Sequence, residues 1–203
     1  MWRLDHLAVT AGALEAGVAL VEAALGVAMA PGGRHPHMST HNRLLALGDV
    51  YLEVITPDPE APEPEHPRWF RLDERRGAPP RLTNWVVGCD DLEAALSGAP
   101  AGAGQAVDLA RGEYRWRMAV PPDGRLPFGD AFPALIQWQG SAHPVRALPA
   151  SGVTLRRLIL THPEANALRR ALAPLRDARV AVVSGPVALR AEFDTPRGRR
   201  VLG

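Results

Sequence analysis

The chain has 203 residues, 46% of them hydrophobic and 22% charged, which is the composition of a soluble globular protein with a sizeable core. All 23 basic residues are arginine and are spread along a chain of net charge +1, so the concentrated basic face that nucleic-acid binding needs is missing. The absence of lysine also excludes a Schiff base or a lysine general base.

The single cysteine and the first apolar segment indicate where in the cell the protein is expected to be. Cys89 has no partner for a disulfide, which is typical of a reducing cytoplasm. Residues 12–30 are apolar, but Glu15 and Glu22 lie on one face of the predicted helix, and strand-like sequence precedes it. We therefore expect an amphipathic helix in a cytoplasmic protein, with no export signal and no membrane partner.

The first module, residues 1–56, is predicted to contain a strand, a helix and three further strands. The elements are a strand at 4–10, a helix at 13–25 ended by Gly26, an extended piece at 28–31, and strands at 42–47 and 50–55 joined by a hairpin at Gly48-Asp49. Alternation divides the opening strand into two faces, with Leu4, His6 and Ala8 on one and Leu7 and Val9 on the other.

A linker and two more modules follow. Residues 57–80 are predicted to be an extended surface linker, because residues 56–67 contain five prolines, with one or two helical turns at 68–76. The second module, 81–147, is expected to have a strand at 82–88, a short helix with a capping box at Asp90 and Glu93, a loop at 98–104, and strands at 114–120 and 134–139. The third, 150–203, is expected to have strands at 155–161, 180–183, 187–193 and 199–202 and a helix at 164–175.

The opening unit is repeated along the chain. Residues 4–16 align with 82–94 at a constant offset of 78, and five of the thirteen aligned positions are identical. A third copy is expected to begin at Leu155, where Arg157 takes the place that His6 and Asn84 have in the first two. Because a protein of two modules builds its site between the copies, unequal residues at equivalent positions bear on its chemistry.

His6 and Glu53 are the candidate catalytic residues. Glu53 lies in the apolar run 51–55 and would be costly to bury without a partner, so it should face a polar cavity or a cation. If the opening and closing strands are neighbours, His6 converges on the same surface. Imidazole and carboxylate can ligate Fe, Mn, Co, Ni or Zn, or can hydrogen-bond each other for structural reasons. Without a metal, Glu53 could act as a base if burial raises its pKa.

Several sequence runs carry a resemblance to a known family. These runs are 33–36, 42–49 and 51–53, together with 126–128, 136–138 and 143–144. They resemble the bacterial glyoxalase-like domain group of the vicinal-oxygen-chelate superfamily over about the first 145 residues. The resemblance implies an α+β fold in which tandem βαβββ modules form a curved mixed sheet cup, here followed by a third βαββ-type module.

In metal-using members of that superfamily, the first and last strands of each module supply the ligands. His6 and Glu53 match the first pair, whereas Asn84 and Gln137 align with the second pair, and amides are poor ligands for a transition metal. A histidine of the loop before the first hairpin is a candidate third ligand of a divalent metal: His35, or else His37 or His41.

Further polar and aromatic residues are candidates for contacting a substrate. The candidate substrate-binding residues are Asn42, Tyr51, Asn84, Arg115, Arg117 and Gln137. Arg115 and Arg117 share a strand face and could hold an anion, or could be an exposed face balanced by nearby acids. Trp85, Trp116 and Trp138 could line the pocket or belong to the core. The loops at 34–40 and 98–111 are expected to determine the substrate.

Three functions are open at this point. The first is a lyase, isomerase or dioxygenase acting on a small oxygenated substrate in the cup between the modules. The second is a metal-free protein that binds and sequesters a small molecule, as antibiotic-binding relatives of this architecture do. The third is a structural or interaction protein with a filled cup. Because the third module would have an unpaired edge and an exposed face, we also expect a homodimer.

Overall fold

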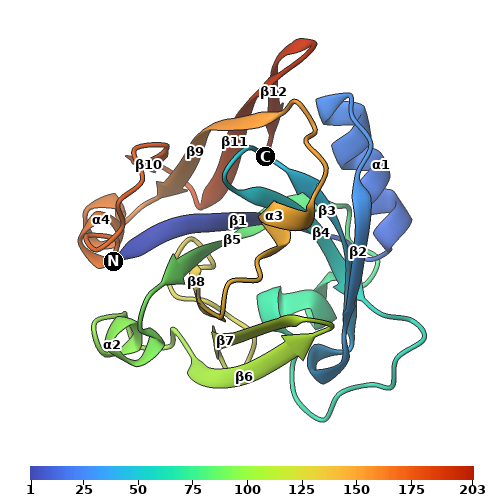
Figure 1. Ribbon diagram of the computed structural model, residues 1–203. Coiled ribbons are helices and arrows are strands. Elements are labelled where there is room, and N and C mark those ends of the chain that lie inside the picture. Colours follow the sequence, from blue (N-terminus) through green and yellow to red (C-terminus); the bar gives the residue numbers. More distant parts are fainter.

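The structure, a computed structural model, describes residues 1–203 and consists of two β-sheets with a few helices at their borders (Figure 1). The first half contains β1 (Trp2–Thr10), α1 (Leu14–Leu25), β2 (Ala30–His35), η1 (Pro36–Met38), β3 (Thr40–Ala46), β4 (Tyr51–Pro57) and η2 (Trp69–Arg75). Next come β5 (Arg81–Cys89), α2 (Leu92–Ser97), β6 (Gln105–Arg111), β7 (Tyr114–Val120), β8 (Ala134–Gln139) and α3 (Pro144–Ala147). The chain ends with β9 (Thr154–His162), α4 (Ala165–Ala171), β10 (Val180–Ser184), β11 (Ala188–Thr195) and β12 (Gly198–Leu202).

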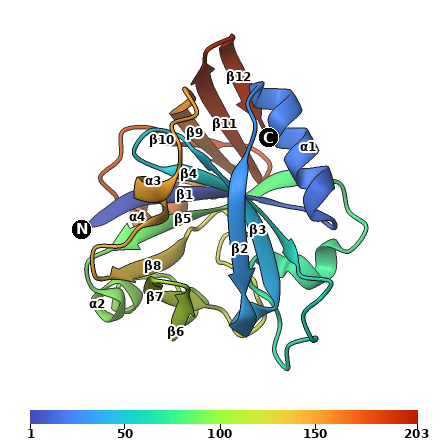
Figure 2. The ribbon, with the colours of Figure 1, turned by 45° about the vertical axis from the view of Figure 1, so that its right-hand side comes forward.

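The large sheet has two equivalent halves. Its eight strands follow the order β2-β3-β4-β1-β5-β8-β7-β6, so each βαβββ module contributes four strands and the modules meet at the antiparallel pair β1 and β5. Within each module the last strand lies parallel to the first. The sheet curls until its two edge strands, β2 and β6, contact each other (Figures 1 and 2). This arrangement confirms the predicted α+β fold with a curved sheet cup.

The main core lies against the outer face of this sheet. Leu7 and Leu52 of the sheet belong to the same buried cluster as Val21 of α1, Leu92 of α2 and Phe193 of β11. A separate, smaller buried cluster lines the inside of the cup. The outer face therefore stabilises the fold, and the inner face is where a site can form.

The amphipathic helix predicted in the first module is α1. Its apolar side packs on the sheet through Leu14, Val21 and Leu25. Gly26 ends the helix with a left-handed φ of 72°, and its N–H bonds to the carbonyl of Glu22. None of the helices has the length and apolar character that spanning a bilayer requires.

The second sheet covers the first instead of leaving its own apolar face open. Leu158 and Leu160 of β9 lie in the main core, and β12 contacts α1. The strand order is β10-β9-β11-β12, with β10 parallel to β9, so the third unit has the predicted elements but not the strand order of the first two modules. The exposed face that motivated the homodimer is thus covered by the chain itself, and the dimer stays a prediction.

Two segments differ from the sequence-based expectations. β6 occupies residues 105–111, which were expected to be loop; it is an edge strand that pairs only with β7, and its alternation is weak because Leu109 is its single buried side chain. Helix α4 ends at Ala171 rather than near Leu175. There the chain turns to bond with β1, through Trp2 N–H to the carbonyl of Pro174 and Arg176 N–H to the carbonyl of Trp2.

Candidate functional site

A β-bulge in β1 places two neighbouring side chains on the inside of the cup. The pairing with β5 shifts register between Leu4 and His6, so Asp5 is the extra residue. Leu4 therefore joins the core on the outer face with Leu7 and Val9, which corrects the expectation that it shares a face with His6. Asp5 and His6, adjacent in sequence, both turn inward and contact each other.

His6 lies between two carboxylates. Its Nδ1 donates to Asp5 Oδ1 at 2.6 Å, and its Nε2 lies 3.5 Å from Glu53 Oε1. All three side chains are buried, and the ring of Tyr51 stacks on the imidazole with 4.4 Å between ring centroids. The sequence-based prediction that His6 and Glu53 converge on one concave surface matches this geometry.

The charges of this trio stabilise each other. Burial alone would lower the pKa of His6, but its hydrogen bonds to Asp5 and Glu53 and their negative charges outweigh burial and raise the pKa to about 9. Burial alone would raise the pKa of Glu53, yet the hydrogen bond and charge of His6 bring that pKa below its usual value. At neutral pH the site therefore holds an imidazolium between two carboxylates, with Glu53 ionised.

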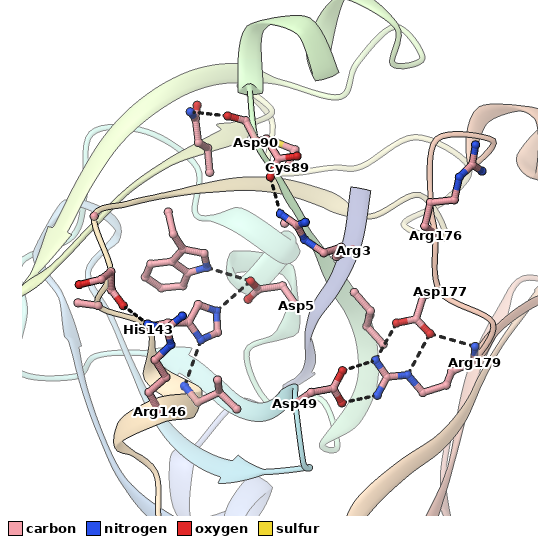
Figure 3. A pocket seen from close by; sticks show the side chains of 18 residues that line it. Arg3, Asp5, Asp49, Cys89, Asp90, His143, Arg146, Arg176, Asp177 and Arg179 are labelled. Carbon is pink, nitrogen blue, oxygen red and sulfur yellow. Dashed lines mark hydrogen bonds and ion pairs between the residues drawn. The ribbon is translucent and has the colours of Figure 1, made fainter. Parts of the chain in front are cut away.

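Asp5 is fixed from the outer side by two more donors. Its Oδ2 accepts from Trp138 Nε1 at 2.9 Å and from His143 Nε2 at 3.1 Å (Figure 3). His143 Nδ1 accepts from Val145 N–H at 3.2 Å, so the hydrogen is on Nε2. Burial would raise the pKa of Asp5, but hydrogen bonds from His143 and His6 dominate and hold the pKa far below its usual value. Asp5 thus orients His6 so that Nε2 faces Glu53.

Glu53 is held from its other side by Asn42, which connects it to the far edge of the sheet. Asn42 Nδ2 donates to Glu53 Oε2 at 2.9 Å, and Asn42 Oδ1 accepts from Gly33 N–H at 2.9 Å and from Arg111 Nη1 at 3.2 Å. Arg111 Nη1 also lies 3.2 Å from His35 Nε2. The site therefore spans both modules, since Arg111 comes from β6 and the others from the first module.

These groups enclose a small cavity with largely aromatic walls. Its volume is about 30 Å³, room for roughly two water molecules. Its apolar lining consists of Trp69, Phe70, Trp116, Met118, Ile136 and Trp138. Trp69 and Phe70 belong to η2, so the helical turns expected in the linker form the cover of the cup, with Phe70 at a left-handed φ of 57°.

Asp5 also borders a wider pocket of about 700 Å³ on the outside of the cup (Figure 3). Arginines and aspartates lie around it, and most of them pair with each other, as Arg179 does with Asp49 and Asp177. His143 is at the boundary between this pocket and the buried trio.

The structure brings only some of the candidate substrate-binding residues to the inner cavity. Asn42 and Tyr51 line it. Arg115 points to solvent and contacts backbone carbonyls, and Arg117 pairs with Glu93 and Asp108, as in the alternative of an exposed, balanced face. Neither arginine lines the cavity, because the face they share is turned away from it.

Asn84 and Gln137 also lie elsewhere. Asn84 is buried beside η2, and its Nδ2 has no hydrogen-bond partner. Gln137 bonds to Leu92 N–H and to the carbonyl of Asp90 at the start of α2. The alignment with Glu53 is displaced: Ala8 pairs with Glu53 in the first module, and Val86, its equivalent, pairs with Ala134 in the second. Alanine therefore stands where the first module has its carboxylate.

The remaining candidates divide between core and site. Trp85 is a core residue whose Nε1 donates to the carbonyl of Ala131, whereas Trp116 and Trp138 line the cavity. Cys89 is buried, and burial raises the pKa of its thiol to about 11, which leaves it unreactive at neutral pH. The His37 ring packs against the His66 ring, tilted by 32°, outside the cavity.

The side chains present do not fit a three-ligand divalent metal centre. No three His, Cys, Asp or Glu side chains are grouped so that they could hold a metal ion. His35, the candidate third ligand beside His6 and Glu53, has its Nε2 against the Arg111 guanidinium, which would repel a cation. The predicted Fe, Mn, Ni, Co or Zn cofactor thus disagrees with this donor set, which combines one imidazole, one carboxylate and a nearby positive charge.

Three polar residues of the site are not among the candidates from the sequence: Asp5, Arg111 and His143. Asp5 precedes His6 directly, but alternation assigns neighbours to opposite faces, and only the bulge overrides it. His143-Pro144 was part of the family resemblance and carried the available signal for His143. For Arg111 the available signal is that residues 98–111 are expected to determine the substrate, although part of that segment forms the strand β6 and not a loop.

The model of a family described as "Glyoxalase-like domain" matches residues 4–176. A hypothetical protein from Staphylococcus aureus is similar in structure, with a TM-score of 0.61 and 13% identity over 92% of this chain and 88% of that chain. No curated protein sequence matches.

Two epimerases are similar at a lower level. A variant of Streptomyces coelicolor methylmalonyl-CoA epimerase has a TM-score of 0.44 and 14% identity, covering 69% of this chain and 98% of its own. The Mycobacterium tuberculosis methylmalonyl-CoA epimerase has a TM-score of 0.45 and 15% identity, covering 71% and 91%. At such identities the likeness of solved structures concerns the fold alone.

Proposed function

Because the chain belongs to the glyoxalase-like domain family, as the resemblance to the vicinal-oxygen-chelate superfamily predicted, we propose that it is an enzyme that moves a proton on a small oxygenated substrate. The reaction class is that of an isomerase or a lyase. The observation that carries the proposal is the buried pair of His6 Nε2 and Glu53 Oε1, 3.5 Å apart at the wall of a cavity with a largely aromatic lining. Both ends of the pair are fixed, His6 by Asp5 and Glu53 by Asn42.

The two groups have complementary roles in proton transfer. Glu53 is ionised and accepts a proton from the carbon next to a carbonyl group of the substrate. The C–H electron pair forms a carbon–carbon double bond, the carbonyl π electrons move to oxygen, and the His6 Nε2–H donates a hydrogen bond or its proton to that oxygen. If the deprotonated carbon bears a hydroxyl group, protonation of the former carbonyl carbon and loss of the hydroxyl proton give the isomeric carbonyl compound. If the carbon on its other side bears a leaving group, the enolate re-forms the carbonyl, a new carbon–carbon double bond forms, and the group departs with its bonding electrons to give a lyase product.

The aromatic lining of the cavity favours this chemistry once a substrate is inside. Aromatic side chains exclude water, so the attraction between His6 and a developing enolate oxygen is weakly screened. A substrate has to displace the side chains of η2, because the cavity holds little more than water. Separating Glu53 from His6 on binding would weaken their pairing and make the carboxylate a better base.

A second candidate function is a metal-free protein that sequesters a small molecule. The aromatic walls favour it, since Trp69, Trp116 and Trp138 offer flat surfaces for a ligand to contact. Sequestration requires binding without any chemical change. The two functions therefore differ in one measurable property, exchange of a substrate hydrogen.

Hydrogen–deuterium exchange tests the proposal. The protein is incubated in D2O with pyruvate, acetoacetate or dihydroxyacetone, and NMR follows loss of the C–H signals next to the carbonyl. We expect the wild type to accelerate exchange and Glu53→Gln to lower the rate about 10²- to 10⁴-fold. Glu93→Gln, an exposed carboxyl outside the cavity, is the matched control. Ligand binding with equal exchange in the wild type and Glu53→Gln favours sequestration instead.

A further inference from the structure

Arg111 is a cation at the cavity with no carboxylate partner. It is the last residue of β6 and reaches across the contact between the sheet edges to the first module. Its protein contacts are His35 Nε2 and Asn42 Oδ1, both neutral acceptors, and the ring of Tyr114, 5.5 Å from the guanidinium carbon. Two neutral acceptors and the Tyr114 ring compensate this half-buried guanidinium only in part, because they leave some of its N–H groups without an acceptor.

Glu53, the carboxylate that lines the same cavity, does not serve as an anion partner for Arg111. Asn42 lies between the two groups and turns its amide carbonyl to Arg111 and its amide N–H to Glu53. The reversed amide would set Nδ2 against the guanidinium and Oδ1 against the carboxylate, so both neighbours fix this orientation. Asn42 thus separates the cation from the base and leaves each available for a ligand.

The neutral ring of His35 helps to hold Arg111 in place. Burial is the main cause that lowers the pKa of His35, and the charge of Arg111 adds to it, giving a pKa of about 4. The neutral ring bonds to Thr40 Oγ1 through Nδ1 at 3.1 Å and presents the Nε2 lone pair to Arg111. Both contacts use Nη1, so the Nε and Nη2 hydrogens, the pair that matches a carboxylate in a two-point contact, have no protein partner.

A close backbone approach makes room for this arginine. A Cβ on Gly33 would lie 2.8 Å from Arg111 Cδ, and Gly33 N–H bonds to the same Asn42 oxygen that accepts from Arg111. A β-bulge in β2 between Pro31 and Arg34 contains Gly33. The glycine at position 33, the bulge in β2 and the hydrogen bonds of Asn42 therefore all help to fix the position of the Arg111 guanidinium.

We infer that Arg111 binds a carboxylate group of the substrate, so that the ligand class of this site is a compact carboxylic acid with a carbonyl group. The inference rests on the proposed function for the reacting carbon, which lies at Glu53 and His6. The ligand then spans the two modules, with its carboxylate on β6 and its carbonyl on β1. A compact acid would require the smallest displacement of the η2 side chains that cover the cavity.

Binding of matched ligands tests this inference. Pyruvate and its uncharged ester, methyl pyruvate, differ at the carboxylate alone, and quenching of tryptophan fluorescence reports binding because three tryptophans line the cavity. We expect the wild type to prefer pyruvate. Arg111→Met should weaken pyruvate binding about 10- to 100-fold and leave methyl pyruvate unchanged, with Arg111→Lys between them. Arg115→Met removes an exposed arginine and should behave as wild type.

Three results would overturn the inference: equal binding of both ligands by the wild type, no binding of pyruvate, or equal losses for both ligands in Arg111→Met. The last would mean that Arg111 only balances the negative charge of Asp5 and Glu53. Far-UV circular dichroism and thermal unfolding of each variant establish that it folds.

The proposed function and this inference can fail separately. Pyruvate binding that depends on Arg111, without any hydrogen exchange, would refute the proposed enzymatic function and support the carboxylate site. Exchange on pyruvate that the wild type accelerates, and that is equally fast in Arg111→Met, would support the enzyme and refute the carboxylate site.

Discussion

Replacement of Asp5 by asparagine should destabilise the protein more than any change of a surface carboxyl. The buried carboxylate accepts from His6 Nδ1 at 2.6 Å, Trp138 Nε1 at 2.9 Å and His143 Nε2 at 3.1 Å. Asparagine supplies one acceptor oxygen and one donor nitrogen. If the nitrogen takes the Oδ1 place it faces His6, and if it takes the Oδ2 place it faces Trp138 and His143. Each orientation sets a donor against a donor.

The magnitude follows from the loss of a buried charge partner. Removing one member of a buried ion pair typically destabilises a protein by about 3–5 kcal/mol. For a chain of this size each kcal/mol lowers the unfolding midpoint by about 2–4 °C, so Asp5→Asn should lower it by roughly 6–20 °C. The pKa of His6 should fall as well, because one of the two carboxylates that raise it to about 9 is gone.

Thermal unfolding and an NMR titration of the His6 ring measure the two effects. The control is Asp90→Asn, whose exposed carboxylate pairs with Arg3 and with the N-terminal amine at 3.3 Å. We expect its midpoint to stay close to wild type because water screens such pairs. If Asp5→Asn unfolds at the temperature of Asp90→Asn, or if His6 titrates as in the wild type, the reasoning about the trio is wrong.

Stability should depend on pH in two windows, which urea denaturation across pH can measure. His6 has a pKa of about 9 in the folded state and 6.5 ordinarily, so its contribution to the free energy of unfolding is complete below pH 6.5 and is lost as pH rises through 9. His35 has a folded-state pKa of about 4, so the free energy of unfolding falls as pH drops from 6.5 through 4. Gly33→Ala should displace Arg111 and weaken pyruvate binding about 10-fold, and Gly98→Ala, which meets no atom within 4 Å, should not. Equal affinities of the two variants would contradict the role of Gly33.

The sequence contains much of the fold because most strands obey local alternation. β4, β7 and β8 were placed within a few residues, and the convergence of His6 and Glu53 followed from making the first and last strands of a module neighbours. Local alternation also correctly assigned Arg115 and Arg117 to one face. Which side that face takes depends on the curl of the whole sheet, which no local pattern records.

The parts that escaped prediction depend on contacts between distant segments. The bulge at Asp5 is defined by its pairing with β5, some eighty residues away. Gln137 was aligned with Glu53 because the insertion between the strands could not be counted, whereas the register selects Ala134. Arg111 became part of the site through the meeting of two sheet edges, which is a property of the assembled sheet.

The meeting of β2 and β6 has a mechanical consequence. These strands touch without a ladder of hydrogen bonds, so the two halves of the cup are joined firmly at β1 and β5 and only loosely at the opposite side. A slight rotation of the two modules about the β1–β5 pair would move β2 and β6 apart and open the cup at that side. A ligand that contacts both Arg111 and His6 would connect β6 to β1 and hold the two modules together. Binding of such a ligand would therefore make the large sheet as a whole more rigid.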